Sequence, residues 1–151
     1  MYDAVDNIYS VLENDATLSA YVKQFTKGGI NKNFMQYPFI NVGHVEMNIE
    51  ETGIGGIGAG GYNIMKVAIE CGTKSTIPEV AFFGDAGQGV KGILQMLDDI
   101  RAVCRANTFN CTFTIPAKII RVVTDVITVK AEWIWVAECT LEGRRKEPRL
   151  R

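Results

Sequence analysis

The sequence contains a single histidine, His44, and four cysteines, none of them spaced as a CxxC pair. A metal site built on imidazoles is therefore excluded, and the cysteines lack the spacing of a zinc knuckle. Cys71 and Cys139 lie in apolar runs typical of strands, so we expect the cysteines to be reduced and buried. No apolar run approaches the ~20 residues of a membrane span, and the acidic start of the chain is unlike a secretory leader. The sequence predicts a cytosolic chain without a metal or another cofactor.

Side chains that could work together as catalysts are also lacking. The adjacent acids at 50–51 and 98–99 point away from each other on a strand or a helix, so we interpret them as surface charge. The glycines of residues 53–58 match G-x-G-x-x-G. However, the residues that follow alternate like a strand, whereas a dinucleotide site requires a helix N-terminus there. We therefore expect neither a nucleotide site nor enzyme activity.

The chain does have the composition of one globular domain. Its 151 residues are 47% hydrophobic and 22% charged, which is close to the average for a single domain. Residues 143–151 hold five basic residues and one acidic residue, a charge of +4. Because the net charge of the whole chain is −1, the remaining residues carry −5. We therefore divide the chain into a single α+β domain, 1–143, and a basic C-terminal tail, 144–151. Such a tail can bind an acidic partner or simply be solvated.

The first half of the chain predicts a helix followed by a pair of strands. Apolar residues recur at helical spacing up to Leu12 and again, after the capping residues Asn14 and Asp15, up to Phe25, which predicts a broken or two-piece helix. A loop is expected over 26–33. Alternating runs after Pro38 and over 62–71 predict an antiparallel hairpin. The alternation slips by one residue around Gly43, which predicts a β-bulge.

The connection between these two strands has the most unusual composition in the chain. Six of the nine residues 53–61 are glycine. A tight hairpin needs only two to five connecting residues, so a longer glycine-rich loop indicates a segment that is either functional or disordered in the free protein.

The second half predicts one more helix and at least two more strands. Asp85 is suited to cap a helix whose apolar face runs from Val90 to Cys104, and Asn107 is suited to end it. The later run is β-branched and aromatic, and Pro116 and Thr124-Asp125 both offer a turn. On one alternating face of its last strand we expect core or interface residues: Trp133, Trp135, Ala137, Cys139 and Leu141. The predicted fold is α+β, ordered α-β-β-α-β-β, with helices packed on one face of an antiparallel sheet of four or slightly more strands.

This arrangement resembles the tail terminator, or tail completion, proteins of long-tailed bacteriophages over nearly the whole chain. The resemblance is carried by VLENDATLSAYV, by YPFINVGHVE with the glycine-rich hairpin to YNIMKVAIEC, by GVKGILQMLDDIRAVCRAN, and by closing strands that end in WIWVAECTLEG. It implies a structural virion protein that forms a ring, usually hexameric. The ring caps the tail tube, stops its polymerisation and provides the surface for head attachment.

The resemblance also implies partners and a location. The partners would be further copies of the chain, the tail-tube protein and a head-side connector, with DNA passing through the lumen and no membrane involved. The chain would be assembled in the bacterial host cytoplasm and reside in the virion tail. Residues of the loop and the tail are then expected to contact neighbouring subunits or the tube: Glu50, Glu51, Gly53, Ile54, Ile57, Tyr62, Arg144, Arg145 and Lys146.

Other functions fit the same pattern. A phage head-tail joining or neck protein shares the size and the assembly into rings. A ferredoxin-like ligand-sensing domain, with the glycine-rich loop closing on an anion, is the alternative from another class, and an unrecognised enzyme is the third.

Overall fold

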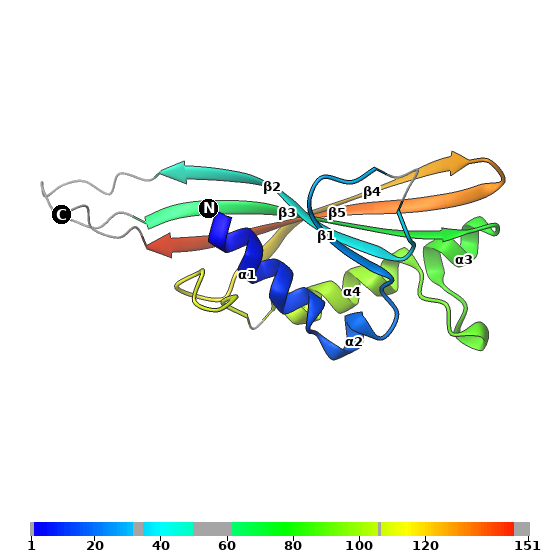
Figure 1. Ribbon diagram of the computed structural model, residues 1–151, viewed down its shortest axis with the longest axis horizontal. Helices are drawn as coiled ribbons and strands as arrows, with labels where there is room; N and C mark the ends of the chain where they lie inside the picture. The colour runs from blue at the N-terminus through cyan, green and yellow to red at the C-terminus, as the bar shows by residue number, and fades with distance from the viewer. Residues whose placement is uncertain (1, 32–34, 50–61, 106, 147–151) are drawn as a thin grey trace, which may run out of the picture.

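The computed structural model describes residues 2–31, 35–49, 62–105 and 107–146. Five strands form one sheet in the order β1-β2-β3-β5-β4. Helices α1, α2 and α4 lie along one side of this sheet, and α3 lies at one end of it (Figure 1). The elements are α1 (Tyr2–Glu13), α2 (Ala16–Ser19), β1 (Gln24–Gly28), β2 (Phe39–Ile49), β3 (Tyr62–Ser75), α3 (Pro78–Phe83), the 3-10 turn η1 (Ala86–Gln88), α4 (Ile93–Cys104), β4 (Lys118–Val129) and β5 (Glu132–Lys146).

The α+β class is confirmed, but the expectation of a purely antiparallel sheet is wrong. Strand β1 replaces the end of the expected helix and the start of the expected loop, and it pairs in parallel with β2, whereas every other pairing among the described strands is antiparallel. Thr26 Oγ1 donates to Asn41 Oδ1 at 2.8 Å across this pairing. A Cβ at Gly43 would overlap the Gly28 carbonyl, so a glycine is required for the close approach of the two strands.

The hairpin of β2 and β3 is confirmed, with the predicted bulge. The register shifts between Gly43 and Val45, and His44 adopts a positive φ of 27° there. The long connection that carries the glycine-rich loop, residues 50–61, lies outside the described residues.

The core forms where the sheet meets α1 and α4. Ile8 and Leu12 of α1 are fully buried, as are Ile93 and Ile100 of α4. Polar contacts also hold α2 on α4: the hydroxyl of Tyr21, just after α2, donates to Asp99 Oδ2 at 2.9 Å. Burial and this carboxylate both raise the pKa of Tyr21, so it remains a hydrogen-bond donor.

The helical region between β3 and β4 differs from its prediction. Asp85 caps η1 and not the long helix, which begins only at Ile93. An additional short helix, α3, was not predicted. The long helix ends at Cys104, before Asn107, whose Oδ1 accepts from the backbone N–H of Phe109 at 2.8 Å.

The last two strands form a hairpin whose turn lies at neither predicted break. Pro116 precedes β4, and Thr124-Asp125 lies inside it, opposite Ala137 and Val136. The turn lies at residues 130–131, where Lys130 has a φ of 55°. The alternating face of β5 is confirmed, although Trp133 remains 36% exposed.

Three of the four cysteines are buried as predicted. Cys71, Cys104 and Cys139 lie in the core, and all four are free thiols. Cys111 is exposed, which corrects the expectation for that residue.

The face of the sheet away from the helices carries a row of alternating charges. Glu46, Lys66, Glu142 and Lys118 are consecutive cross-strand partners on β2, β3, β5 and β4. Directly opposed residues of opposite charge stabilise a sheet modestly, by about 0.2–1 kcal/mol for a pair.

Candidate assembly surface

Most of the residues expected to make subunit contacts cannot be placed. Glu50, Glu51, Gly53, Ile54 and Ile57 lie outside the described residues, as do residues 147–151 of the basic tail. The remaining four lie where β3 begins and β5 ends: Tyr62, Arg144, Arg145 and Lys146. Strand β5 therefore includes the first three residues that were assigned to the tail, and its end pairs with the start of β3.

Arg145 is engaged within its own chain. Its Nη1 donates to Asp3 Oδ1 at 3.1 Å, and its Nη2 forms an ion pair with the other carboxylate oxygen. The hydrogen bond from Arg145 lowers the pKa of Asp3 to about 2. Because this bidentate pair joins the first helix to the last strand, Arg145 has a structural role in the subunit itself. Arg144 is exposed, and its backbone carbonyl accepts from the N–H of Thr114 at 2.9 Å.

Strand β4 forms an edge of the sheet and exposes apolar side chains on both faces. Val122 is paired with Cys139 on the side of the helices, and Val123 with Glu138 on the other side. They are 49% and 44% exposed, and Ile120, at a bulge of this strand, is 48% exposed. Strands that are apolar on both faces are normally covered on both faces. A long apolar edge also offers unpaired backbone groups to another chain. Strand β4 therefore has the character of an interface strand.

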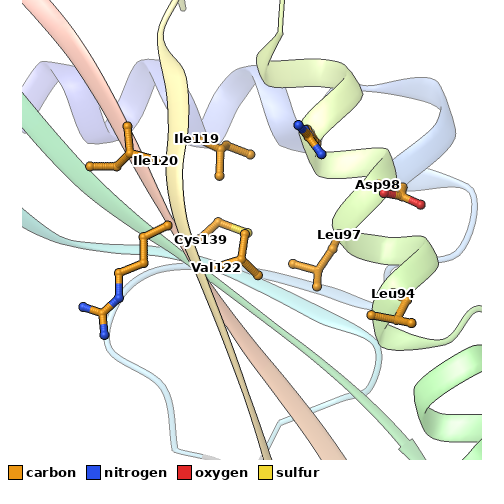
Figure 2. Close-up of a pocket in the computed structure, with 9 residues that line it drawn as sticks. Leu94, Leu97, Asp98, Ile119, Ile120, Val122 and Cys139 are labelled. Atoms are coloured by element: carbon orange, nitrogen blue, oxygen red, sulfur yellow. The ribbon is translucent and has the colours of Figure 1, made fainter.

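A groove separates β4 from α4 on the helix side of the sheet. Its main hollow has a volume of about 500 Å³. Leu94 and Leu97 of α4 lie across from Val122, and Cys139 of β5 lies beside Val122, its cross-strand partner (Figure 2). We call this hollow, lined by the following residues, the α4–β4 groove: Leu94, Leu97, Asp98, Arg101, Ile119, Ile120, Arg121, Val122 and Cys139.

The surroundings of the α4–β4 groove are basic. A second hollow of about 340 Å³ continues it toward the end of α4 and shares Arg101 and Ile119 with it. Along both hollows lie four cations, Arg101, Arg105, Lys118 and Arg121, and one acid, Asp98, a net charge of +3. All five are exposed. The groove thus offers an apolar floor with a positively charged rim.

A second exposed apolar feature lies at the end of the sheet near α3. Phe83 is 61% exposed and Ile77 is 53% exposed. Ile77 precedes helix α3 and Phe83 is its last residue. The helix is attached to the sheet, since Thr73 Oγ1 donates to the Ala81 carbonyl at 2.6 Å and Phe82 packs on Trp135 with ring centroids 4.5 Å apart. We call residues 77–90 the α3 projection.

Hydrogen bonds and close packing hold the α3 projection beyond its helix as well. Asp85 and Val90 exchange two backbone hydrogen bonds of 2.9 Å. Gly84, with a φ of 83°, has no room for a Cβ against Gln95 and Gly92 at the start of α4. The projection contains two acids, Glu79 and Asp85, and no basic residue. It is therefore an ordered, acidic element with exposed apolar side chains.

Side chains that could bind a metal ion do not gather in the described part of the chain. Within the described ranges, no cluster of three His, Cys, Asp or Glu side chains is placed to hold a metal ion. Among the same residues, no helix has both the length and the apolar character needed to cross a membrane.

Comparison with known proteins gives a likeness of fold. No family model matches the chain, and no curated protein matches it in sequence. Among solved structures, the chain is similar to one described as the virion of a native gene transfer agent particle, with a TM-score of 0.59 and 13% identity. The match covers 95% of this chain and 94% of that chain. The two chains therefore share a fold over almost their whole length.

The sequence interpretation missed both features of this surface. Leu94 was expected on the apolar face of the helix but is 36% exposed in the groove, whereas Met96, which was not placed on that face, is fully buried. Leu97 packs against the core as expected and also lines the groove. A signal for the edge strand was present, because the run IIRVV at 119–123 has apolar residues on both sides of the strand.

Proposed function

We propose that this chain is a structural virion protein and, more specifically, a tail terminator whose ring caps the tail tube. The observation that carries the proposal is the match over 95% of the chain to a component of a gene transfer agent virion. The tail terminator role itself comes from the sequence resemblance. An edge strand that is apolar on both faces supports assembly with other subunits.

The proposal assigns the chain a scaffolding role instead of catalysis. A heterologous ring requires two different complementary surfaces on each subunit, and we propose the α4–β4 groove and the α3 projection for these two roles. The partners would be further copies of the chain, the tail-tube protein and a head-side connector. Its place would be the virion tail, after assembly in the host cytoplasm.

Light scattering of the purified protein, with and without the tail-tube protein, tests this function. We expect either a ring near 100 kDa, which is six times 16.7 kDa, or a monomer that joins tube ends and stops their growth. Binding to the head-side connector alone, without any effect on tubes, would favour a neck protein. A strict monomer indifferent to both would refute the virion role, and a thermal-shift screen with anions would then test the ligand-sensing alternative.

A further inference from the structure

We infer that the α3 projection of one subunit docks in the α4–β4 groove of a second copy of the same chain. The inference rests on the proposed ring and names its subunit contact. The contact is heterologous, with the projection as one side and the groove as the other.

Apolar complementarity is the first argument. The projection presents Phe83 and Ile77, each more than half exposed, and the groove presents Leu94 and Val122. Aromatic side chains that enter a pocket are the usual anchors of an interface, because they bury a large area at a low cost in side-chain entropy. The groove, at about 500 Å³, falls in the range of cavities that hold compact ligands.

Charge complementarity is the second argument, and it selects a second copy as the occupant. The projection carries a charge of −2 from Glu79 and Asp85, and the two hollows carry +3. A rim of opposite sign directs the encounter and disfavours other partners. The chain thus contains both halves of one complementary pair.

Rigidity is the third argument. Phe82, which precedes Phe83, packs its ring on Trp135. The backbone carbonyl of Ala81 accepts a hydrogen bond from the Thr73 hydroxyl. Phe83 stands edge-on to Phe82, with ring centroids 4.7 Å apart. Because the projection is already ordered in the single chain, docking requires little further loss of conformational freedom.

Mixing two defective variants tests this contact. Phe83→Asp damages the projection and leaves the groove intact, whereas Val122→Asp damages the groove and leaves the projection intact. We expect each variant alone to lose self-association by roughly thirtyfold or more. An equimolar mixture should form a species near 33 kDa, twice 16.7 kDa, because one intact projection still meets one intact groove.

Two further variants control for folding. Ile115→Asp changes a side chain of similar exposure, 53%, outside both surfaces, and it should assemble like the unaltered chain. Leu94→Asp damages the groove at the first turn of α4, where an acidic residue favours the helix, and it should behave like Val122→Asp. Thermal melting of every variant verifies that it is folded.

The possible outcomes separate this inference from the proposed function. Unchanged assembly of Phe83→Asp and Val122→Asp, or a mixture that stays monomeric, overturns the contact while the ring stands. If the unaltered chain is monomeric and Phe83→Asp no longer joins tubes, the occupant is the tube protein and the second-copy contact is wrong. An unaltered chain that neither associates nor binds tubes refutes the proposed function itself.

Discussion

Replacing Gly143 with alanine should destabilise the subunit. Gly143 is a buried residue of β5, and a Cβ built on it would overlap the ring of Phe113. Phe113 is 2% exposed and stands edge-on to Phe109, with ring centroids 6.1 Å apart. The backbone N–H of Thr114 donates to the Arg144 carbonyl at 2.9 Å, so the loop that carries Phe113 cannot retreat without breaking this hydrogen bond.

The size of the effect follows from this confinement. Forcing an added methyl into a packed site costs about 1–3 kcal/mol. For a chain of this length, that corresponds to a decrease in melting temperature of about 2–12 °C. Urea unfolding should show a lower midpoint with an unchanged slope, because the surface exposed on unfolding stays the same.

Gly29→Ala is the matched control. No atom lies within 4 Å of a Cβ built at Gly29, so its free energy of unfolding should change by less than ~0.5 kcal/mol. A second test combines Gly143→Ala with Phe113→Leu. The combined loss should be smaller than the sum of the two single losses, because the smaller leucine relieves the overlap that the added methyl creates. Equal midpoints for Gly143→Ala and Gly29→Ala would refute this account of the packing.

Two other properties can be checked in the single chain. Replacing Arg145 with glutamine should raise the pKa of Asp3 from about 2 toward 3.8, as followed by NMR. Because the folded-state pKa is the lower one, the pair stabilises the chain above about pH 4, by no more than ~1 kcal/mol for so exposed a carboxylate. This difference between the variant and the unaltered chain should vanish as the pH falls through 2, and a difference that persists there would argue against an ionic cause. In a labelling experiment at pH 8, iodoacetamide should modify Cys111 rapidly, as mass spectrometry would show, and rapid labelling of the other three would contradict their burial. Burial keeps those three thiols protonated. It raises the pKa of Cys71 well above its usual value, the pKa of Cys104 to about 12 and the pKa of Cys139 to about 11.

The sequence was informative where periodicity was long and local. The hairpin of β2 and β3, its bulge near Gly43 and the long helix all followed from the spacing of apolar residues. Strand β1 could not be predicted, because Phe25 continues the helical spacing and Thr26–Gly28 has a loop-like composition. The segment becomes a strand only through pairing with β2. Helix α3 is too short for a periodic pattern, although Pro78 at its start and Gly84 after its end are recognisable boundary signals.

The candidate surface depends on tertiary neighbours that no local pattern specifies. Leu94 and Met96 both fit a helical apolar face, and only the position of the sheet decides that Met96 is buried while Leu94 lines the groove. Likewise, Phe83 follows the equally apolar Phe82. The contact with Trp135 of a distant strand decides which of the two rings remains outside.

The row of charges across the open face bears on how the chain avoids misfolding. A slip of two residues between β3 and β5 would keep every apolar side chain on its proper face, so hydrophobicity alone hardly opposes it. Such a slip would move Lys66 from Glu142 to Thr140 or to Arg144. The same shift of β4 would bring Lys118 against one of the same two residues. Glu142 lies between the neutral Thr140 and the basic Arg144 on this face of β5. Its pairing with Lys66 and Lys118 therefore favours the native register of β5 with β3 and β4 over a slip of two residues.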